Sequence, residues 1–234
     1  MDYRDYIDGQ TGEQFWFKSK KDLINILMNK IGRKNLKILN IGSGTGVDLE
    51  IMNRFGNIYI IDINKKALDL IPSNLYSEKK VCDATALPYP NDFFDIVCSF
   101  DVFEHIENDK KAVLEAHRVL KKNGLLLLMV PAFNFLFSAH DKALLHYRRY
   151  SKKKLYDLLR IFKYEYLSYW NSILFIPLSI LRILKKRAKP KTDYFNLPSL
   201  LEKAFLNFLR IENKLIMKDY RLPFGLSLVG VYRK

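Results

Sequence analysis

Three glycines separated by single residues, Gly42, Gly44 and Gly46, follow a short apolar run, and their spacing points to a binding function. Glycines between a strand and a helix let the chain reverse without side chains in the way. The bare backbone also lets a nucleotide approach the N-terminus of the following helix. The pattern predicts a nucleotide site whose turn includes Ser43, and a plain tight turn is the alternative.

Two carboxylates follow the next predicted strands. Asp62 lies 20 residues after Gly42, the spacing at which a carboxylate at a strand end meets the hydroxyls of a ribose. A carboxylate suits this task because it accepts hydrogen bonds from both hydroxyls at once. The alternative role of Asp62 is a helix N-cap. Asp83 follows a short third strand that ends at Val81.

Residues 131–150 show no clear period, and long connections of this kind are usually functional. The segment holds His140, Asp141, His146, Arg148, Arg149 and Tyr150. A histidine can remove a proton from an acceptor hydroxyl near neutral pH. We expect His140 to be this base, with Asp141 or Asp101 fixing its tautomer. His146 and His105 are the next candidates.

The two arginines of this segment suit recognition of an anion. Arg148 and Arg149, with Tyr150, can grip a phosphate or carboxylate on the acceptor. The alternative is a hinge of salt bridges that leads into the next helix. His140, Asp141 and His146 also form a candidate metal set. We nevertheless predict a site without metal.

The elements that must position these residues read as strands alternating with helices. Near-continuous apolar strands predict a parallel sheet covered by helices on both faces. The strands are expected at 38–41, 57–61, up to 81, 94–100, 125–130, 164–169 and 223–233. The helices are expected to begin near Ser19, Val47, Ile106, Ser151, Asn171 and Pro198. The helix after Ile106 is expected to carry Lys121 and Lys122 in its last turn.

The length, charge and cysteine content of the chain limit the classes of protein to which it can belong. The chain has 234 residues and a net charge of +14, which fits one α/β domain with additions. Residues 1–150 carry a net +2 and residues 151–234 a net +12. The polar, acidic N-terminus predicts no signal peptide, and no apolar run is long enough to span a bilayer. Cys82 and Cys98 match no paired spacing and indicate reduced thiols of a cytosolic protein.

Together the motifs of residues 36–131 resemble those of class I S-adenosylmethionine-dependent methyltransferases of the small-molecule, type 11-like group. The glycine turn resembles that family's first motif, and Asp62 matches its ribose-binding acid. Asp83 matches the carboxylate at the adenine, and Ser99–His105 matches the segment that lines the methyl-transfer site. The resemblance implies a doubly wound, Rossmann-like α/β fold with seven strands, the last antiparallel, and a helical C-terminal insertion. The implied cofactor is S-adenosylmethionine, and the product is S-adenosylhomocysteine.

Similarity to one bacterial and archaeal subgroup extends over nearly the whole chain. It implies that Lys20 meets the cofactor's carboxylate. The cofactor-binding residues are then Phe15, Trp16, Lys20, Gly42, Ser43, Gly44, Gly46, Asp62, Ile63, Asp83, Ala84, Ser99 and Asp101. The aromatic residues of segment 1–17 are expected to form a lid over a flat ligand, or alternatively a patch packed on the sheet; they are Tyr3, Tyr6, Phe15, Trp16 and Phe17. Asn40 departs from the family, which usually has an acid there for which Asp48 or Asp101 can compensate.

A second metal set follows from this resemblance. Asp101, Glu104 and His105 resemble a metal-binding pattern of some quinone-type methyltransferases, although methyl transfer itself needs no metal.

The C-terminal part suggests contact with a membrane. Residues 171–184 are largely apolar, and residues 182–191 are strongly basic. An apolar helix beside a cationic cluster is typical of an interfacial anchor on an anionic membrane. The alternatives are a helical hairpin over the acceptor site or a contact between two subunits of a homodimer. In the helix after Pro198, Leu201, Ala204, Phe205, Phe208 and Leu215 are expected to face the core.

These patterns predict four parts: 1–35 with lid and helix, 36–170 as cofactor-binding core, 171–220 as helical cap and 221–234 as final strand. The predicted function is O-methylation of a saccharide or lipid-linked small molecule in the cytoplasm, at the inner membrane face if the cap binds lipid. One alternative is a nucleic-acid methyltransferase, although the chain lacks an Asn-Pro-Pro-Tyr-type motif. The other is a cofactor-binding, membrane-associated protein without activity, which Asn40 suggests.

Overall fold

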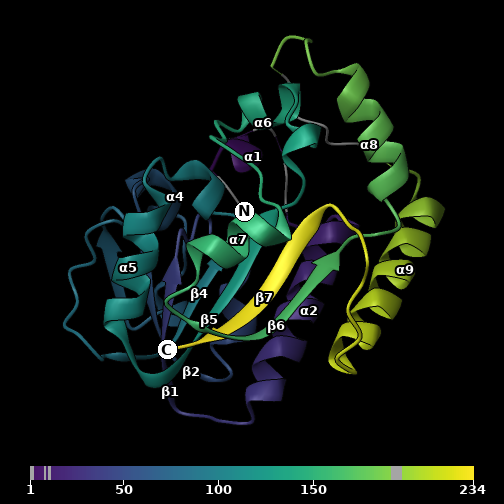
Figure 1. The fold of residues 1–234 in the computed structure, drawn as a ribbon. Coiled ribbons are helices and arrows are strands. Elements are labelled where there is room, and N and C mark those ends of the chain that lie inside the picture. The colour runs from purple at the N-terminus through teal and green to yellow at the C-terminus, as the bar shows by residue number, and fades with distance from the viewer. Residues whose placement is uncertain (1–2, 8, 10–11, 191–196) are drawn as a thin grey trace.

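A seven-stranded mixed sheet forms the centre of the molecule (Figure 1). The computed structural model describes residues 3–7, 9, 12–190 and 197–234. The strand order is β3-β2-β1-β4-β5-β7-β6, and β7 is antiparallel to both neighbours. The strands are β1 (Leu36–Ile41), β2 (Gly56–Asp62), β3 (Glu78–Val81), β4 (Phe94–Phe100), β5 (Leu120–Pro131), β6 (Lys163–Trp170) and β7 (Ser227–Arg233). The predicted doubly wound sheet with an antiparallel last strand is confirmed.

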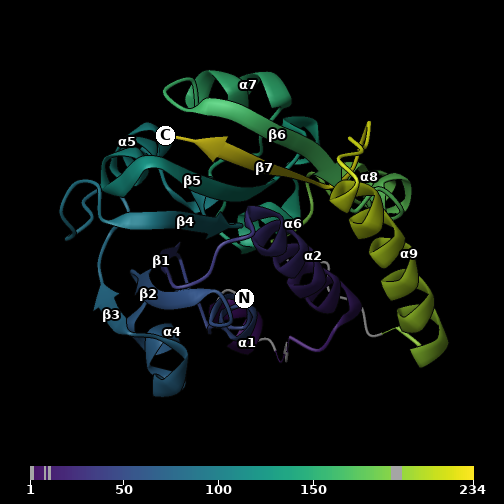
Figure 2. The same cartoon turned by 90° about the horizontal axis from the view of Figure 1, so that it is seen from below.

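Helices cover both faces of the sheet (Figure 2). The helices are α1 (Tyr3–Ile7), α2 (Phe15–Ile31), α3 (Leu49–Met52), α4 (Lys65–Asp69), α5 (Asp109–Val119), α6 (Ala139–Ala143), α7 (Lys152–Leu158), α8 (Phe175–Leu184) and α9 (Ser199–Met217). Three short 3₁₀ turns are η1 (Ser73–Leu75), η2 (Phe103–His105) and η3 (Asn134–Leu136). The buried side chains of α5 and α7 belong to one core cluster, and those of α2, α3 and α9 to the other. Strands such as β1 and β4 supply apolar side chains to both clusters, as expected for a sheet buried on both faces.

Two predicted boundaries are wrong. α2 begins at Phe15, so Ser19 lies inside the helix and does not cap it. Its side chain is fully buried against α9, where its oxygens accept hydrogen bonds from Asn213 Nδ2. α5 ends at Val119, and Lys121 and Lys122 already belong to β5. Pairing of Leu120 with Phe94 in β4 ends the helix earlier than its apolar period suggests.

The predicted buried face of α9 is only partly correct, although Phe205 does pack against the core as expected. Leu201 and Phe208 are 46% and 49% exposed, although both were expected in the core. The buried residues of α9 are Leu209, Glu212, Asn213 and Ile216. Polar groups on the inner face therefore set the rotation of this helix. Glu212 accepts hydrogen bonds from the backbone nitrogens of Ser172 and Ile173, just before α8.

Asn213 joins three elements and should be important for stability. Its Oδ1 accepts a hydrogen bond from Trp170 Nε1 at 2.9 Å, and its Nδ2 donates to the Ser19 carbonyl at 2.9 Å. Asn213→Ala should lower the free energy of unfolding by about 2–4 kcal/mol, because each buried group left unpaired costs about 1–3 kcal/mol. Urea denaturation measures this loss. The exposed Asn207→Ala serves as the control on the same helix, and equal stability of the two variants would contradict the expectation.

Candidate functional site

One large cavity opens where the parallel strands end. Its volume is about 1340 Å³, and its lining includes Ile41, Asp62, Phe100 and Pro131, which end β1, β2, β4 and β5. Ligands of α/β sheets bind at this carboxyl edge. The volume exceeds the roughly 300–1,000 Å³ typical of a pocket for one small molecule. The cavity therefore has room for two ligands side by side.

The glycine turn and Asp62 form one hydrogen-bonded unit at this edge. Asp62 Oδ2 accepts a hydrogen bond from Gly44 N at 2.8 Å, and Oδ1 accepts one from Asn64 N at 2.8 Å. Gly42 has a φ of +68°, and an added Cβ would lie 2.5 Å from Val102 Cγ2. Only glycine fits there without displacement of neighbouring atoms. Asn64, and not Asp62, caps α4, since Asn64 Oδ1 accepts from the backbone nitrogens of Lys66 and Ala67.

The next stretch of the wall suits a flat apolar ring with polar edges. Ile63 is 75% exposed, and Ala84 is buried beneath the cavity surface. Asp83 lies on the surface and accepts a hydrogen bond from Thr85 N at 2.7 Å. A carboxylate for ribose hydroxyls, a second for an adenine edge and apolar side chains between them fit an adenosine. These residues thus fit the nucleoside part of S-adenosylmethionine.

A buried lysine joins α2 to the strand edge. Lys20 Nζ lies 2.9 Å from Asp101 Oδ2 and 3.4 Å from Asp48 Oδ2. Burial alone would lower the pKa of Lys20, but the charges of Asp101 and Asp48 outweigh it and raise the pKa. Lys20, predicted to meet the cofactor's carboxylate, is therefore a charged bridge between two acids. Asn40 donates to Met52 Sδ and does not line the cavity.

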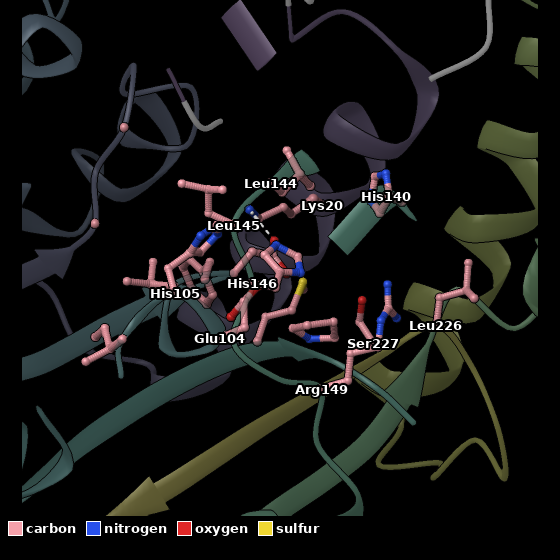
Figure 3. Close-up of a pocket in the computed structure, with 18 of the residues that line it drawn as sticks. Lys20, Glu104, His105, His140, Leu144, Leu145, His146, Arg149, Leu226 and Ser227 are labelled. Atoms are coloured by element: carbon pink, nitrogen blue, oxygen red, sulfur yellow. Dashed lines mark hydrogen bonds and ion pairs between the residues drawn. The ribbon is translucent and has the colours of Figure 1, made fainter. Parts of the chain in front are cut away.

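A second polar group gathers Glu104, His105 and His146 on the cavity wall (Figure 3). The rings of His105 and His146 meet edge to face, with centroids 4.5 Å apart. Glu104 is 1% exposed, and burial followed by the charge of Asp101 raises its pKa well above the ordinary value. The sequence placed Glu104 and His146 in two separate candidate sets. The fold brings them together at the cavity wall. Glu104 lies in η2, just after β4, and His146 lies in the loop after α6.

Asp141 holds His146 and not the expected His140. Its Oδ1 lies 2.9 Å from His146 Nδ1 and accepts from Arg149 Nε at 2.7 Å, while Oδ2 accepts from Ser138 N. Burial alone would raise the pKa of Asp141, but the hydrogen bond from His146 and the charge of Arg149 lower it. His140 also lines the cavity, and burial followed by the charge of Arg182 lowers its pKa well below the ordinary value.

Several predicted residues lie outside the cavity lining. Ser43, Gly46, Ser99, Asp141, Arg148 and Tyr150 are among them. Arg148 pairs with Asp109 at 2.8 Å, and Tyr150 OH donates to the same carboxylate at 2.8 Å. This arrangement matches the alternative of a salt-bridged hinge before α7. Arg149 lines the cavity, although its guanidinium is bound to Asp141 and the Ala132 carbonyl.

The remaining wall is apolar and was only partly anticipated. Phe15, Trp16 and Phe17 line the cavity from the start of α2, and Phe15 contacts the Phe205 ring at 5.4 Å between centroids. Further apolar residues of this wall include Trp170, Leu174, Pro177, Leu178, Leu181, Leu197, Phe205 and Leu226. The apolar character of residues 171–184 was visible in the sequence, and a helical hairpin over the acceptor site was one of the alternatives for this segment. Leu178 and Leu181 of α8 line the cavity.

Comparison with known proteins relates residues 39–128, and the fold as a whole, to methyltransferases. Residues 39–128 match the family described as methyltransferase domain. An uncharacterized protein of Methanocaldococcus jannaschii is 33% identical over 109 residues, 46% of each chain. The ubiquinone/menaquinone biosynthesis C-methyltransferase UbiE of Cupriavidus taiwanensis is 28% identical over 184 residues, 70% of this chain and 72% of the relative.

A solved structure extends the likeness over most of the fold. An S-adenosylmethionine-dependent methyltransferase from Archaeoglobus fulgidus superposes with a TM-score of 0.58 and 17% identity, covering 94% of this chain and 99% of that one. The chain spans less than half the length of the first curated relatives it matches. The matched segment contains the glycine turn, Asp62, Asp83 and Glu104, and S-adenosylmethionine is the cofactor of this class. The match over residues 39–128 and the shared fold therefore support a class I, S-adenosylmethionine-dependent methyltransferase.

Proposed function

We propose that this protein transfers a methyl group from S-adenosylmethionine to a small molecule that carries a hydroxyl group and an apolar arm. The observation that carries the proposal is the composition of one cavity. Its nucleoside end has Gly42 and Asp62, its polar centre has Glu104 and His146, and its far wall is apolar. The apolar wall favours a lipid-linked acceptor over a free saccharide, because a sugar presents few apolar atoms to such a surface.

The chain's own residues have three tasks in this reaction. Asp62 and Asp83 hold the nucleoside, which brings an electrophilic methyl group on a sulfonium to the cavity. The ion pair between the buried Lys20 and the partly exposed Asp101 keeps α2 close to the end of β4. The cluster of Glu104, His105 and His146 is where we place activation of the acceptor hydroxyl. Alignment of acceptor and methyl group in one closed space supplies much of the acceleration.

Activation of the acceptor hydroxyl can lead to two different methylated products. Loss of the hydroxyl proton leads to O-methylation, which the sequence predicted. The name of the Cupriavidus relative supports C-methylation as the second candidate. If the acceptor is a phenol, loss of the same proton also makes a ring carbon nucleophilic, and that carbon can then take the methyl group. Nuclear magnetic resonance of the product separates a methoxy group from a ring methyl group.

Radiolabel transfer tests the substrate class. Purified protein incubated with methyl-labelled S-adenosylmethionine and a lipid extract should move label into the organic phase. A water-soluble saccharide extract, tested in parallel, should stay unlabelled. Label confined to the saccharide fraction would contradict the apolar arm, label in added RNA would support the nucleic-acid alternative, and no label in any fraction would favour the protein without activity.

Asp62 should decide cofactor affinity. Asp62→Asn removes the charge that the ribose hydroxyls and the Gly44 amide share, so calorimetry with S-adenosylhomocysteine should show affinity about 10–100-fold lower. Asp69→Asn is the matched control, because Asp69 lies at the exposed end of α4 and pairs with Lys65 and Lys79. Equal affinity of Asp62→Asn and the wild type would contradict the assignment.

His146 should be required for rapid turnover but not for cofactor binding. His146→Ala should lower kcat about 10²–10⁴-fold, the usual contribution of proton transfer by a positioned side chain. Affinity for S-adenosylhomocysteine should stay unchanged. His117→Ala is the control, since His117 packs on Phe162 away from the cavity. His140→Ala in the same series tests the original expectation, and a loss seen only with this variant would move the role to His140.

We also propose that α8 rests on an anionic membrane surface and that the acceptor enters from there. Ile176, Ile180 and Leu184 on its outer side are 63%, 56% and 78% exposed. Leu178 and Leu181 on its inner side line the cavity, so α8 is apolar on both sides. Lys186, Arg187 and Lys189 are exposed beyond its end, whereas Arg182 turns inward. Lys191 lies outside the described residues.

Vesicle sedimentation tests this surface. Among the described residues no helix is long and apolar enough to cross a bilayer, so attachment would have to be interfacial. The combined Lys186→Gln, Arg187→Gln and Lys189→Gln variant should bind phosphatidylglycerol vesicles about 100-fold more weakly, at about 1 kcal/mol for each charge. Lys65→Gln, Lys66→Gln and Lys110→Gln form the equal-charge control. A stable dimer that buries α8, without vesicle binding, would contradict the proposal and support the homodimer.

A further inference from the structure

Glu104, His105 and His146 have the composition and spacing of a site for a divalent cation. One ligand atom from each residue lies within 4.8 Å of the other two. Two imidazoles and one carboxylate form a donor set that Zn²⁺, Mn²⁺ and related ions accept. All three side chains face the cavity, where Figure 3 shows them together beside Lys20. Three protein ligands leave coordination positions open for a molecule in the cavity.

The burial of Glu104 is the independent observation that points to a ligand. Its side chain is 1% exposed, and Oε2 has no hydrogen-bond partner among the residues that the structure describes. Buried polar atoms are nearly always paired, and an unpaired one costs about 1–3 kcal/mol. A cation between Glu104 and the two imidazoles would satisfy this oxygen. The nearby Lys20 pairs with Asp101 and Asp48.

The surroundings of His146 prepare it as a ligand. Its Nδ1 lies 2.9 Å from Asp141 Oδ1, so a proton on Nδ1 leaves Nε2 with a free lone pair. Metal-bound histidines usually have such a carboxylate on the other ring nitrogen. Asp141 is itself held by Arg149 Nε at 2.7 Å and Ser138 N at 2.9 Å. The ring of His146 is thus fixed by a hydrogen-bonded network of Asp141, Arg149 and Ser138.

We propose that the cavity binds one divalent cation through Glu104, His105 and His146. Binding itself does not depend on the proposed methyl transfer. What the ion does there rests on that function: an acceptor hydroxyl at an open position loses its proton to water more readily, as metal-bound water does. His146 then acts as a ligand, and the ion activates the hydroxyl. The set combines one residue of the first sequence-derived metal set with two of the second, and it replaces our expectation of no metal.

Calorimetry of chelator-treated protein with zinc, manganese or magnesium chloride tests the site without cofactor or acceptor. We expect one ion per chain for at least one of these salts. Glu104→Gln and His146→Ala should each lower the affinity at least 10-fold. Cobalt substitution should give a visible absorption band that both variants lose. His117→Ala is the matched control and should bind as the wild type does.

Thermal melting separates a metal ligand from a purely structural carboxyl group. Without metal, Glu104→Gln should melt at the wild-type temperature or above it, because the substitution removes a buried unpaired acid. With metal, only the wild type and His117→Ala should gain stability. No binding of any of the salts, or equal binding by Glu104→Gln, would overturn the proposal. Metal binding without any turnover would instead leave the site in place and count against the proposed function.

Discussion

The parallel alignment of β1, β2 and β4 is the constraint on which the cavity depends. Ile41 pairs with Ile61 and with Ser99, so the three strands end at the same level. The glycine turn, Asp62 and Asp101 follow these ends and meet at one edge although they are far apart in the chain. A shift of one residue in either pairing would turn the inward side chains outward and separate these groups. Lys20 then closes the edge from outside the sheet by bridging Asp48 and Asp101.

Local patterns were enough to predict which residues gather at the ends of the first strands. Gly42 directly follows β1, Asp62 ends β2 and Asp83 lies two residues after β3, and a strand's end is visible in the sequence as the end of an apolar run. The partners of Lys20 were not predictable in this way, because Lys20 and Asp101 are 81 residues apart. Asp141 pairs with His146 because the chain turns back after α6, where His146 N donates to the Asp141 carbonyl. Sequence spacing alone could not decide it.

The errors in the helices have a common physical cause. The predicted inner face of α9 followed its large apolar residues, but Asn213 and Glu212 are buried there to satisfy backbone and indole groups. Leu201 and Phe208 therefore point outward. α5 ends early because the residues after it pair with β4 as part of β5. Local helix propensity carries no information about such pairing between distant segments. In each case a distant partner outweighed the local period.

The two ends of the cavity differ in how far they are shared with relatives. The family match covers residues 39–128, which supply the nucleoside end and Glu104. Lys20, His140, His146 and the apolar wall of α8 and α9 lie outside it. A common fold supports many reactions through differences at its loops and insertions. Under the proposed function, we expect residues outside the match to contribute most to the choice of acceptor.

A crystal structure of the complex with S-adenosylhomocysteine tests the central claim most directly. The account predicts ribose hydroxyls on Asp62, the adenine edge near Asp83 and the sulfur directed toward Glu104 and His146. The apolar end of the cavity should remain open for a second molecule. Binding of the nucleoside elsewhere, or a sulfur directed away from that cluster, would contradict the account.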